Sequence, residues 1–168
     1  MKVLIVSDSH GLTEELLNVK ARHKDCDYLI HCGDSELRMD DPAMDGFLAV
    51  QGNCDMEPYP TELIRDIGEI TLYVTHGHLY NVKMTLMNLS YKSEETGANI
   101  ICFGHSHLAG SEMVDGRLFI NPGSMRLPRR ISSKTYILLE LDGREAKVDF
   151  YDVEGNFIEH LSSTYTLA

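Results

Sequence analysis

Histidine, aspartate and asparagine side chains stand directly after short apolar runs in this sequence, usually beside a glycine. Asp8-Ser9-His10 is the first such group along the chain, and His105-Ser106-His107 is the last. In an extended segment alternate side chains point the same way, so both histidines of a His-x-His pair can approach one centre. The metal-binding residue types at these positions are Asp8, His10, Asp34, Asn53, His76, His78, His105 and His107.

This combination of side chains indicates a particular metal chemistry. Imidazole, carboxylate and amide oxygen ligands suit Mn, Fe or Zn, whereas a structural zinc site usually contains thiolates. The ligands suffice for two cations, and one carboxylate, Asp34, can bridge them at a spacing of about 3.5–4 Å. Such a pair would hold a bridging hydroxide for in-line attack on phosphorus and clamp the phosphoryl oxygens. The ligand set therefore predicts phosphoryl chemistry.

The apolar pattern predicts the elements that must position these groups. Strands are expected at residues 2–7, 27–31, 47–51, 62–66, 69–75, 99–103, 108–114, 117–121, 135–141 and 144–152. Helices are expected from Thr13, as an N-cap, to about Lys24, and over residues 81–96. Asp115-Gly116 and Asp142-Gly143 are hairpin turn signals. Ligands at the carboxyl ends of parallel strands are the expected arrangement in an open α/β sheet.

The order of these elements indicates the fold class. A strand, a helix and another strand with short connections are typical of a parallel α/β layer. The second half of the chain is richer in strands and hairpins, which favours two stacked sheets with helices outside. There is no linker, repeat or low-complexity segment, so we expect a single domain over residues 1–168.

Composition excludes several classes of protein. The 168 residues include 15 Lys and Arg against 26 Asp and Glu, a formal net charge of −11 that argues against non-specific nucleic-acid binding. The apolar runs are strand-sized, shorter than a membrane span or a signal peptide needs. The four cysteines form no CxxC pair and are expected to be reduced, which predicts a cytoplasmic protein.

Taken in order, the motifs resemble the calcineurin-like metallophosphoesterase superfamily. Gly52-Asn53-Cys54-Asp55 and Asn121-Pro122-Gly123-Ser124 are similar to segments of its small bacterial and archaeal phosphodiesterases of the YfcE type. The resemblance implies a four-layer αββα sandwich of two mixed β-sheets flanked by helices. It assigns one cation to Asp8, His10, Asp34 and His107, and the other to Asp34, Asn53, His76 and His105. Mn is the expected ion, with Fe, Zn, Ni and Mg as alternatives.

The resemblance also implies roles in catalysis for Asp34, Asn53, Cys54 and His76. Substrate contacts are predicted for Ser124, for Arg126 in a local basic cluster and for His78, with a solvated surface position as the alternative for Arg126 and His78. Many members of the superfamily have a histidine where Cys54 stands, as a candidate general acid for the leaving group. A thiol is a poorer proton donor to an alkoxide at neutral pH, so either Cys54 contacts the substrate or another group donates the proton. We therefore expect aryl or nucleotide-like phosphodiesters to be hydrolysed better than alkyl monoesters.

Three functions remain open at this stage. The first is a phosphodiesterase acting on a small phosphoester. The second is a metal-binding protein-interaction scaffold on the same fold, as in the retromer subunit Vps29, although every ligand position here holds a competent residue. The third is a nuclease, which the acidic balance disfavours. A homo-oligomer is expected by analogy with relatives, and no membrane partner is expected.

Overall fold

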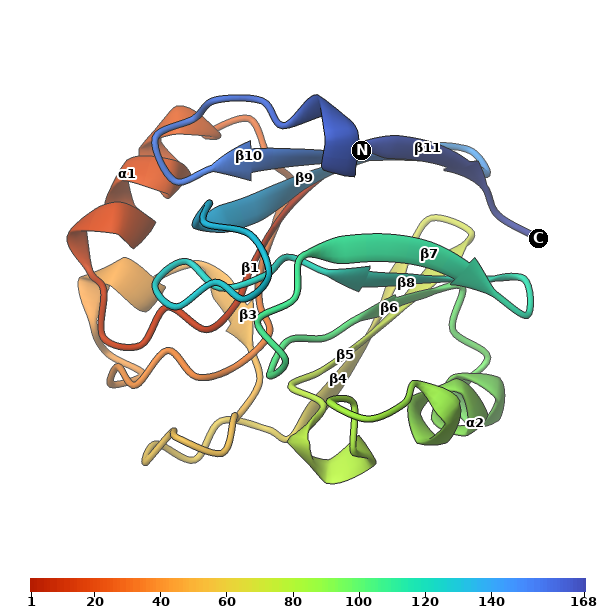
Figure 1. Ribbon diagram of the computed structural model, residues 1–168, viewed down its shortest axis with the longest axis horizontal. Coiled ribbons are helices and arrows are strands. Elements are labelled where there is room, and N and C mark those ends of the chain that lie inside the picture. Colours follow the sequence, from red (N-terminus) through yellow and green to blue (C-terminus); the bar gives the residue numbers. More distant parts are fainter.

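Two mixed β-sheets packed face to face form the centre of the computed structural model, which describes residues 1–168 (Figure 1). The first sheet has the spatial order β11 (Ser163–Thr166), β10 (Glu145–Asp152), β9 (Thr135–Asp142), β1 (Lys2–Val6), β2 (Tyr28–His31) and β3 (Phe47–Ala49). The second has the order β4 (Glu62–Ile67), β5 (Ile70–Thr75), β6 (Ile100–Cys102), β8 (Arg117–Asn121) and β7 (Gly110–Val114). The helices are α1 (Glu14–Arg22) and α2 (Met87–Thr96).

The central strands of each sheet bury side chains on both faces, as the alternating side chains of β1 illustrate. Val3 and Ile5 belong to the core between the two sheets, which is the largest apolar cluster. Leu4, between them, points to the opposite face and joins the cluster that contains Leu16 and Val19 of α1. In this way the pleat of a single strand places helix, sheet and sheet in successive layers.

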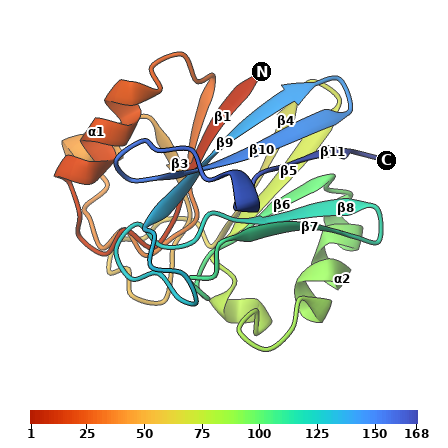
Figure 2. The ribbon, with the colours of Figure 1, turned by 45° about the horizontal axis from the view of Figure 1, so that its top comes forward.

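The second helix covers the outer face of the other sheet in the same manner. Leu89 of α2 packs in one buried cluster with Tyr73 of β5, Ile101 of β6 and Phe119 of β8. The two helices therefore lie on opposite outer sides of the sheet pair (Figures 1 and 2). The predicted four-layer αββα sandwich is confirmed.

The second helix is shorter than predicted. It begins at Met87, and the segment before it contains a short 3-10 helix at His78–Tyr80. Asn81 has a left-handed backbone with φ of 54°, which an α-helix cannot include. Val82 contributes to the apolar pattern that predicted the helix, but it lies in the preceding loop, where its side chain packs beside Gly77. The predicted start at residue 81 is therefore wrong.

Parallel pairing sets the direction of the strands that matter for function. β1 pairs in parallel with β2, and β2 with β3, so the carboxyl ends of these three strands lie at the same edge of the first sheet. β5 and β6 are also parallel neighbours in the second sheet. The loops after them meet, since the amide of His105 donates to Asp8 Oδ2 (3.1 Å) and the amide of Gly104 donates to the carbonyl of His76 (3.0 Å).

The remaining elements carry no predicted site residue. Asp115 and Gly116 both have positive φ, 49° and 78°, which agrees with the predicted tight hairpin turn between β7 and β8.

Neither α-helix has the length and apolar character needed to cross a bilayer. All four cysteines are free thiols.

Candidate metal centre

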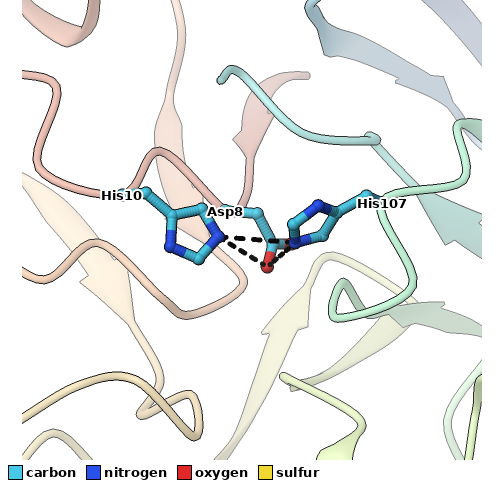
Figure 3. Close-up of side chains that lie close together, drawn as sticks. All are labelled: Asp8, His10 and His107. Atoms are coloured by element: carbon cyan, nitrogen blue, oxygen red, sulfur yellow. Dashed lines mark hydrogen bonds and ion pairs between the residues drawn. The ribbon is translucent and has the colours of Figure 1, made fainter. Parts of the chain in front are cut away.

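Asp8 is the centre of the first group of side chains (Figure 3). It follows β1 and its carboxylate is completely buried. Asp8 Oδ1 lies 3.1 Å from Nε2 of His107 and 3.8 Å from Nε2 of His10, and these two nitrogens are 3.4 Å apart. One carboxylate oxygen and two imidazole nitrogens thus converge on one point, within the distances that a shared cation requires.

A second group forms around Asp34, which follows β2. Asp34 Oδ2 is 3.2 Å from Nε2 of His76, and the same nitrogen is 3.1 Å from Oδ1 of Asn53. The ring of His105 lies 5.1 Å from that of His76, and Asp34, His76 and His105 can share one ion. The two groups adjoin, because His76 Nε2 is also 3.8 Å from Asp8 Oδ1. All seven predicted ligands are therefore brought into one contiguous cluster.

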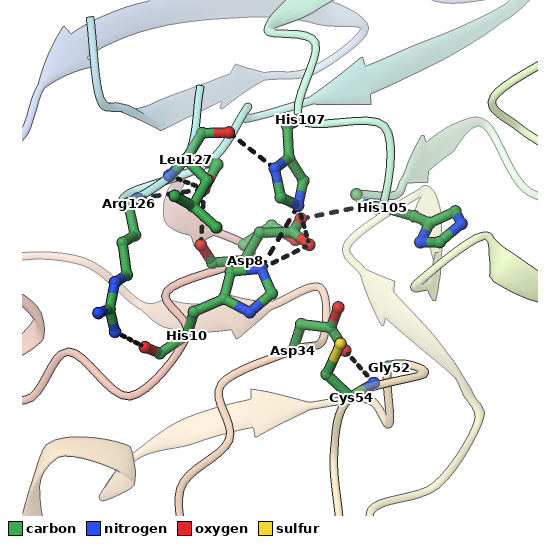
Figure 4. Close-up of polar contacts among 12 residues, drawn as sticks. Asp8, His10, Asp34, Gly52, Cys54, His105, His107, Arg126 and Leu127 are labelled. Atoms are coloured by element: carbon green, nitrogen blue, oxygen red, sulfur yellow. Dashed lines mark hydrogen bonds and ion pairs between the residues drawn. The ribbon is translucent and has the colours of Figure 1, made fainter. Parts of the chain in front are cut away.

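Backbone acceptors orient two of the imidazoles. Nδ1 of His76 donates to the carbonyl of Cys32 (2.7 Å), and Nδ1 of His107 donates to the carbonyl of Leu127 (2.7 Å; Figure 4). With its proton on Nδ1, a neutral ring presents the lone pair of Nε2 to the carboxylates. Lone pair and carboxylate repel each other unless a second proton or a cation lies between them. The donor set therefore fits divalent cations.

The pKa values of the clustered side chains also indicate that the site favours positive charge. Burial acts to raise the pKa of Asp8, but the hydrogen bond from His107 and the charge of His76 outweigh it and hold that pKa below its usual range. Burial acts to lower the pKa of His76, but Asp34 and Asp8 raise it above its ordinary value. Bound cations would compete with these protons, so metal affinity is expected to fall as the pH is lowered.

The backbone of the ligand loops is strained. Left-handed φ angles occur at five predicted ligands: Asp8, His10, Asp34, His105 and His107. Such a conformation costs about 1–3 kcal/mol for a residue other than glycine and persists only where the surroundings enforce it. Strain of this kind is typical of functional sites, and it is concentrated here on the residues that the sequence nominates as ligands.

Two positioning residues were missed by sequence reasoning. The carboxylate of Asp55 accepts backbone N–H bonds from Gly52 (2.7 Å), Asp34 (2.8 Å) and Glu36 (2.8 Å), and so joins the loops after β2 and β3. His31 is fully buried, and burial lowers its pKa to about 4. Its Nδ1 accepts from the amide of Gly33, so Nε2 donates to the Ser9 hydroxyl (2.8 Å).

Two of the predicted substrate or catalytic residues lie beside the cluster. Cys54 is exposed, and its amide donates to Asp34 Oδ1 (2.8 Å; Figure 4). Partial burial and the charge of Asp34 raise the pKa of the Cys54 thiol to about 11, so it is protonated at neutral pH. His78 packs 5.4 Å from His76 and 6.1 Å from His105 between ring centres, and its buried Nδ1 has no partner.

Ser124 and Arg126 are held more tightly by the protein than the sequence predicts. The Ser124 side chain is fully buried, donates to the carbonyl of Asp8 (2.7 Å) and accepts from the amides of Arg126 and Leu127. No hydrogen-bonding capacity remains for a substrate, so the predicted contact is corrected to a positioning role. The Arg126 guanidinium donates to the carbonyl of His10 at the rim of the cluster, where it stays a candidate substrate contact (Figure 4).

Comparison with known proteins identifies the class to which this fold and cluster belong. Residues 1–144 match the calcineurin-like phosphoesterase superfamily domain, and the chain is a member of that superfamily of divalent-metal phosphoesterases. It is 51% identical to the probable metallophosphoesterase YsnB of Bacillus subtilis, over 99% of this chain and 100% of that protein. A structure from Streptococcus pneumoniae, a predicted phosphoesterase, matches at 34% identity and a TM-score of 0.93, covering 98% and 97% of the two chains.

Two further matches are more distant in sequence. Phosphodiesterase YfcE of Escherichia coli is 28% identical over 56% of this chain and 53% of its own length. Vps29 of Entamoeba histolytica shares the fold, with a TM-score of 0.77 and 18% identity over the full length of both chains. The expected resemblance to the superfamily and to its YfcE-type members is confirmed.

Proposed function

We propose that this protein is a metal-dependent phosphodiesterase that hydrolyses aryl or nucleotide-like phosphodiesters with two divalent cations, Mn being the preferred ion. The observation that carries the proposal is the pair of adjoining acceptor groups around Asp8 and Asp34, with imidazole nitrogens directed into each. Four free thiols support a cytoplasmic location, where thiols are kept reduced.

Each residue of the cluster has a place in this chemistry. Asp8, His10 and His107 would hold one cation, His76, His105 and Asn53 the other, and Asp34 would serve both. Bound cations would supply Lewis-acid activation of a water nucleophile and neutralise charge on the phosphoryl oxygens. Asp34 Oδ2 faces His76, whose Nε2 in turn lies 3.8 Å from Asp8 Oδ1 in the other half of the cluster.

Residues outside the ligand set would orient the substrate. Arg126 is bonded to the loop of His10, and His78 packs on His76. The guanidinium of Arg126 is suited to an anionic phosphoryl oxygen.

Protonation of the leaving group limits the range of substrates. The Cys54 thiol is protonated and exposed, but with a pKa of about 11 it is a slow acid at neutral pH. An aryl oxide or nucleotide phosphate departs without much help, whereas an alkoxide needs a proton. This favours activated diesters over alkyl monoesters.

A phosphoester panel tests the proposal. Protein freed of metal with a chelator should not hydrolyse bis(4-nitrophenyl) phosphate, and Mn²⁺ should restore turnover. The kcat/KM for this diester should exceed that for glycerol phosphate, an alkyl monoester, by at least about 10²-fold, as expected where general-acid help is missing. Folded, Mn-loaded protein without diesterase activity would disprove the proposal, and faster hydrolysis of the alkyl monoester would reverse the substrate assignment.

The alternative is a protein-interaction scaffold, and the fold shared with Vps29 is consistent with it. In that case the cluster could bind metal without supporting turnover. The panel separates the two functions directly, because a scaffold would bind Mn²⁺ and leave the diester intact.

A further inference from the structure

Glu36 contacts one of the predicted ligands in an unusual way. Its Oε1 accepts a hydrogen bond from Nδ1 of His10 at 2.6 Å, while Nε2 of the same ring faces Asp8 and His107. Two other rings of the cluster, His76 and His107, also have a partner at Nδ1. In both, Nδ1 donates to a neutral backbone carbonyl. Among these three rings, only that of His10 has its Nδ1 paired with a carboxylate.

The backbone is built to hold this pair together. Glu36 has a left-handed φ of 55°, which a long side chain rarely adopts, and Asp55 Oδ1 fixes the conformation by accepting the Glu36 amide (2.8 Å). The neighbouring loops are also joined directly, because the amide of His10 donates to the carbonyl of Asp34 (3.0 Å). The Glu36 carboxylate is partly exposed, so nothing in the packing of the core explains why its backbone is kept in this conformation.

We infer that Glu36 is a positioning residue that keeps His10 in the Nδ1–H form and strengthens it as a ligand. A carboxylate on the far nitrogen fixes the tautomer and the ring orientation, and it raises the basicity of the nitrogen that faces the cation. Glu36 thereby raises the divalent-cation affinity of the group formed by Asp8, His10 and His107. This inference rests on the proposed metal-binding function of His10.

Replacement of Glu36 tests the inference through metal binding. Partners of this kind typically contribute about 10–100-fold to affinity, so Glu36→Ala should raise the Kd of one of two Mn²⁺ ions by that factor. Glu36→Gln retains an oxygen acceptor without the charge, so its loss should be smaller. Mn²⁺ titration followed by electron paramagnetic resonance gives both Kd values. Glu154→Gln removes the same charge from an exposed position elsewhere and should bind like the wild type.

A second readout does not involve metal. In the metal-free wild type, ¹⁵N chemical shifts should place the His10 proton on Nδ1, and Glu36→Ala should populate the other tautomer. Glu36→Ala that binds two Mn²⁺ with wild-type Kd values would overturn the inference while leaving the proposed function intact. A wild type that binds no Mn²⁺ would overturn both. An equal loss in Cys54→Ala would also overturn it, since Glu36 and Cys54 would then be direct ligands beside His10.

Discussion

Asp34→Asn is expected to lower kcat for a phosphodiester by about 10³-fold, the upper end of the range for removal of one charge-stabilising group. Asp34 is almost completely buried, and each of its oxygens already has a position: Oδ2 near His76 and Oδ1 on the amide of Cys54. The asparagine amide has the same shape but only one oxygen and no charge. With its nitrogen donating to the lone pair of His76 and its oxygen accepting the Cys54 N–H, it presents no anionic oxygen to a cation. The carboxylate that we propose to be shared by two cations is therefore lost.

The same substitution should leave the fold intact, because the side-chain volume and the surrounding backbone bonds are preserved. Thermal unfolding followed by circular dichroism should give a midpoint within a few degrees of that of the wild type. The number of Mn²⁺ ions bound per protein should fall below two. Asp115→Asn is a matched control, since Asp115 is exposed in a turn and also has a left-handed φ. Wild-type turnover by Asp34→Asn would show that Asp34 does not join the two cations.

Gly52→Ala is the second substitution with a large expected effect. A Cβ at this position would lie 2.0 Å from Asp34 Oδ1 and 2.6 Å from the Asp34 backbone nitrogen. The backbone of the Asp34 loop must therefore move, and a displacement of about 1 Å near reacting groups can cost 10²-fold in rate. Overpacking of this kind also lowers stability by about 1–3 kcal/mol. Steady-state kinetics and urea unfolding measure the two effects.

Gly110→Ala provides the comparison for Gly52→Ala. Gly110 lies on β7, has no positive φ, and a Cβ there meets no atom within 4 Å. It should retain wild-type activity and nearly all stability. If Gly52→Ala were as active as Gly110→Ala, the close packing of Gly52 on Asp34 would have no part in positioning the carboxylate.

The strands were largely predictable because their signal is local. The β1 run stops at Asp8 and the β2 run at Cys32, and these ends appear where the apolar pattern changes. The strand at Ser163–Thr166 was not predicted, since it lies at a sheet edge with mostly exposed side chains and carries little apolar pattern. The predicted start of α2 was wrong for a related reason. Val82 and Leu86 pack as loop residues, so their helical spacing was misleading.

The clustering of the predicted ligands could be foreseen because each one follows a strand and the strands end together. The residues that hold the ligand loops in place were not, because their contacts join backbone groups far apart in sequence. The Asp55 carboxylate binds three amides across two loops, and His31 reaches Ser9 over 22 positions. Ser124 was misassigned because a serine hydroxyl that binds only backbone cannot be distinguished in sequence from one that is free for substrate.

The central claim is that Asp34 is shared by two divalent cations. Anomalous diffraction at the manganese edge from crystals grown with Mn²⁺ tests it most directly. We expect two anomalous peaks about 3.5–4 Å apart, one beside Asp8, His10 and His107 and one beside His76 and His105, with the Asp34 carboxylate between them. A single peak, or two peaks of which only one contacts Asp34, would contradict the account.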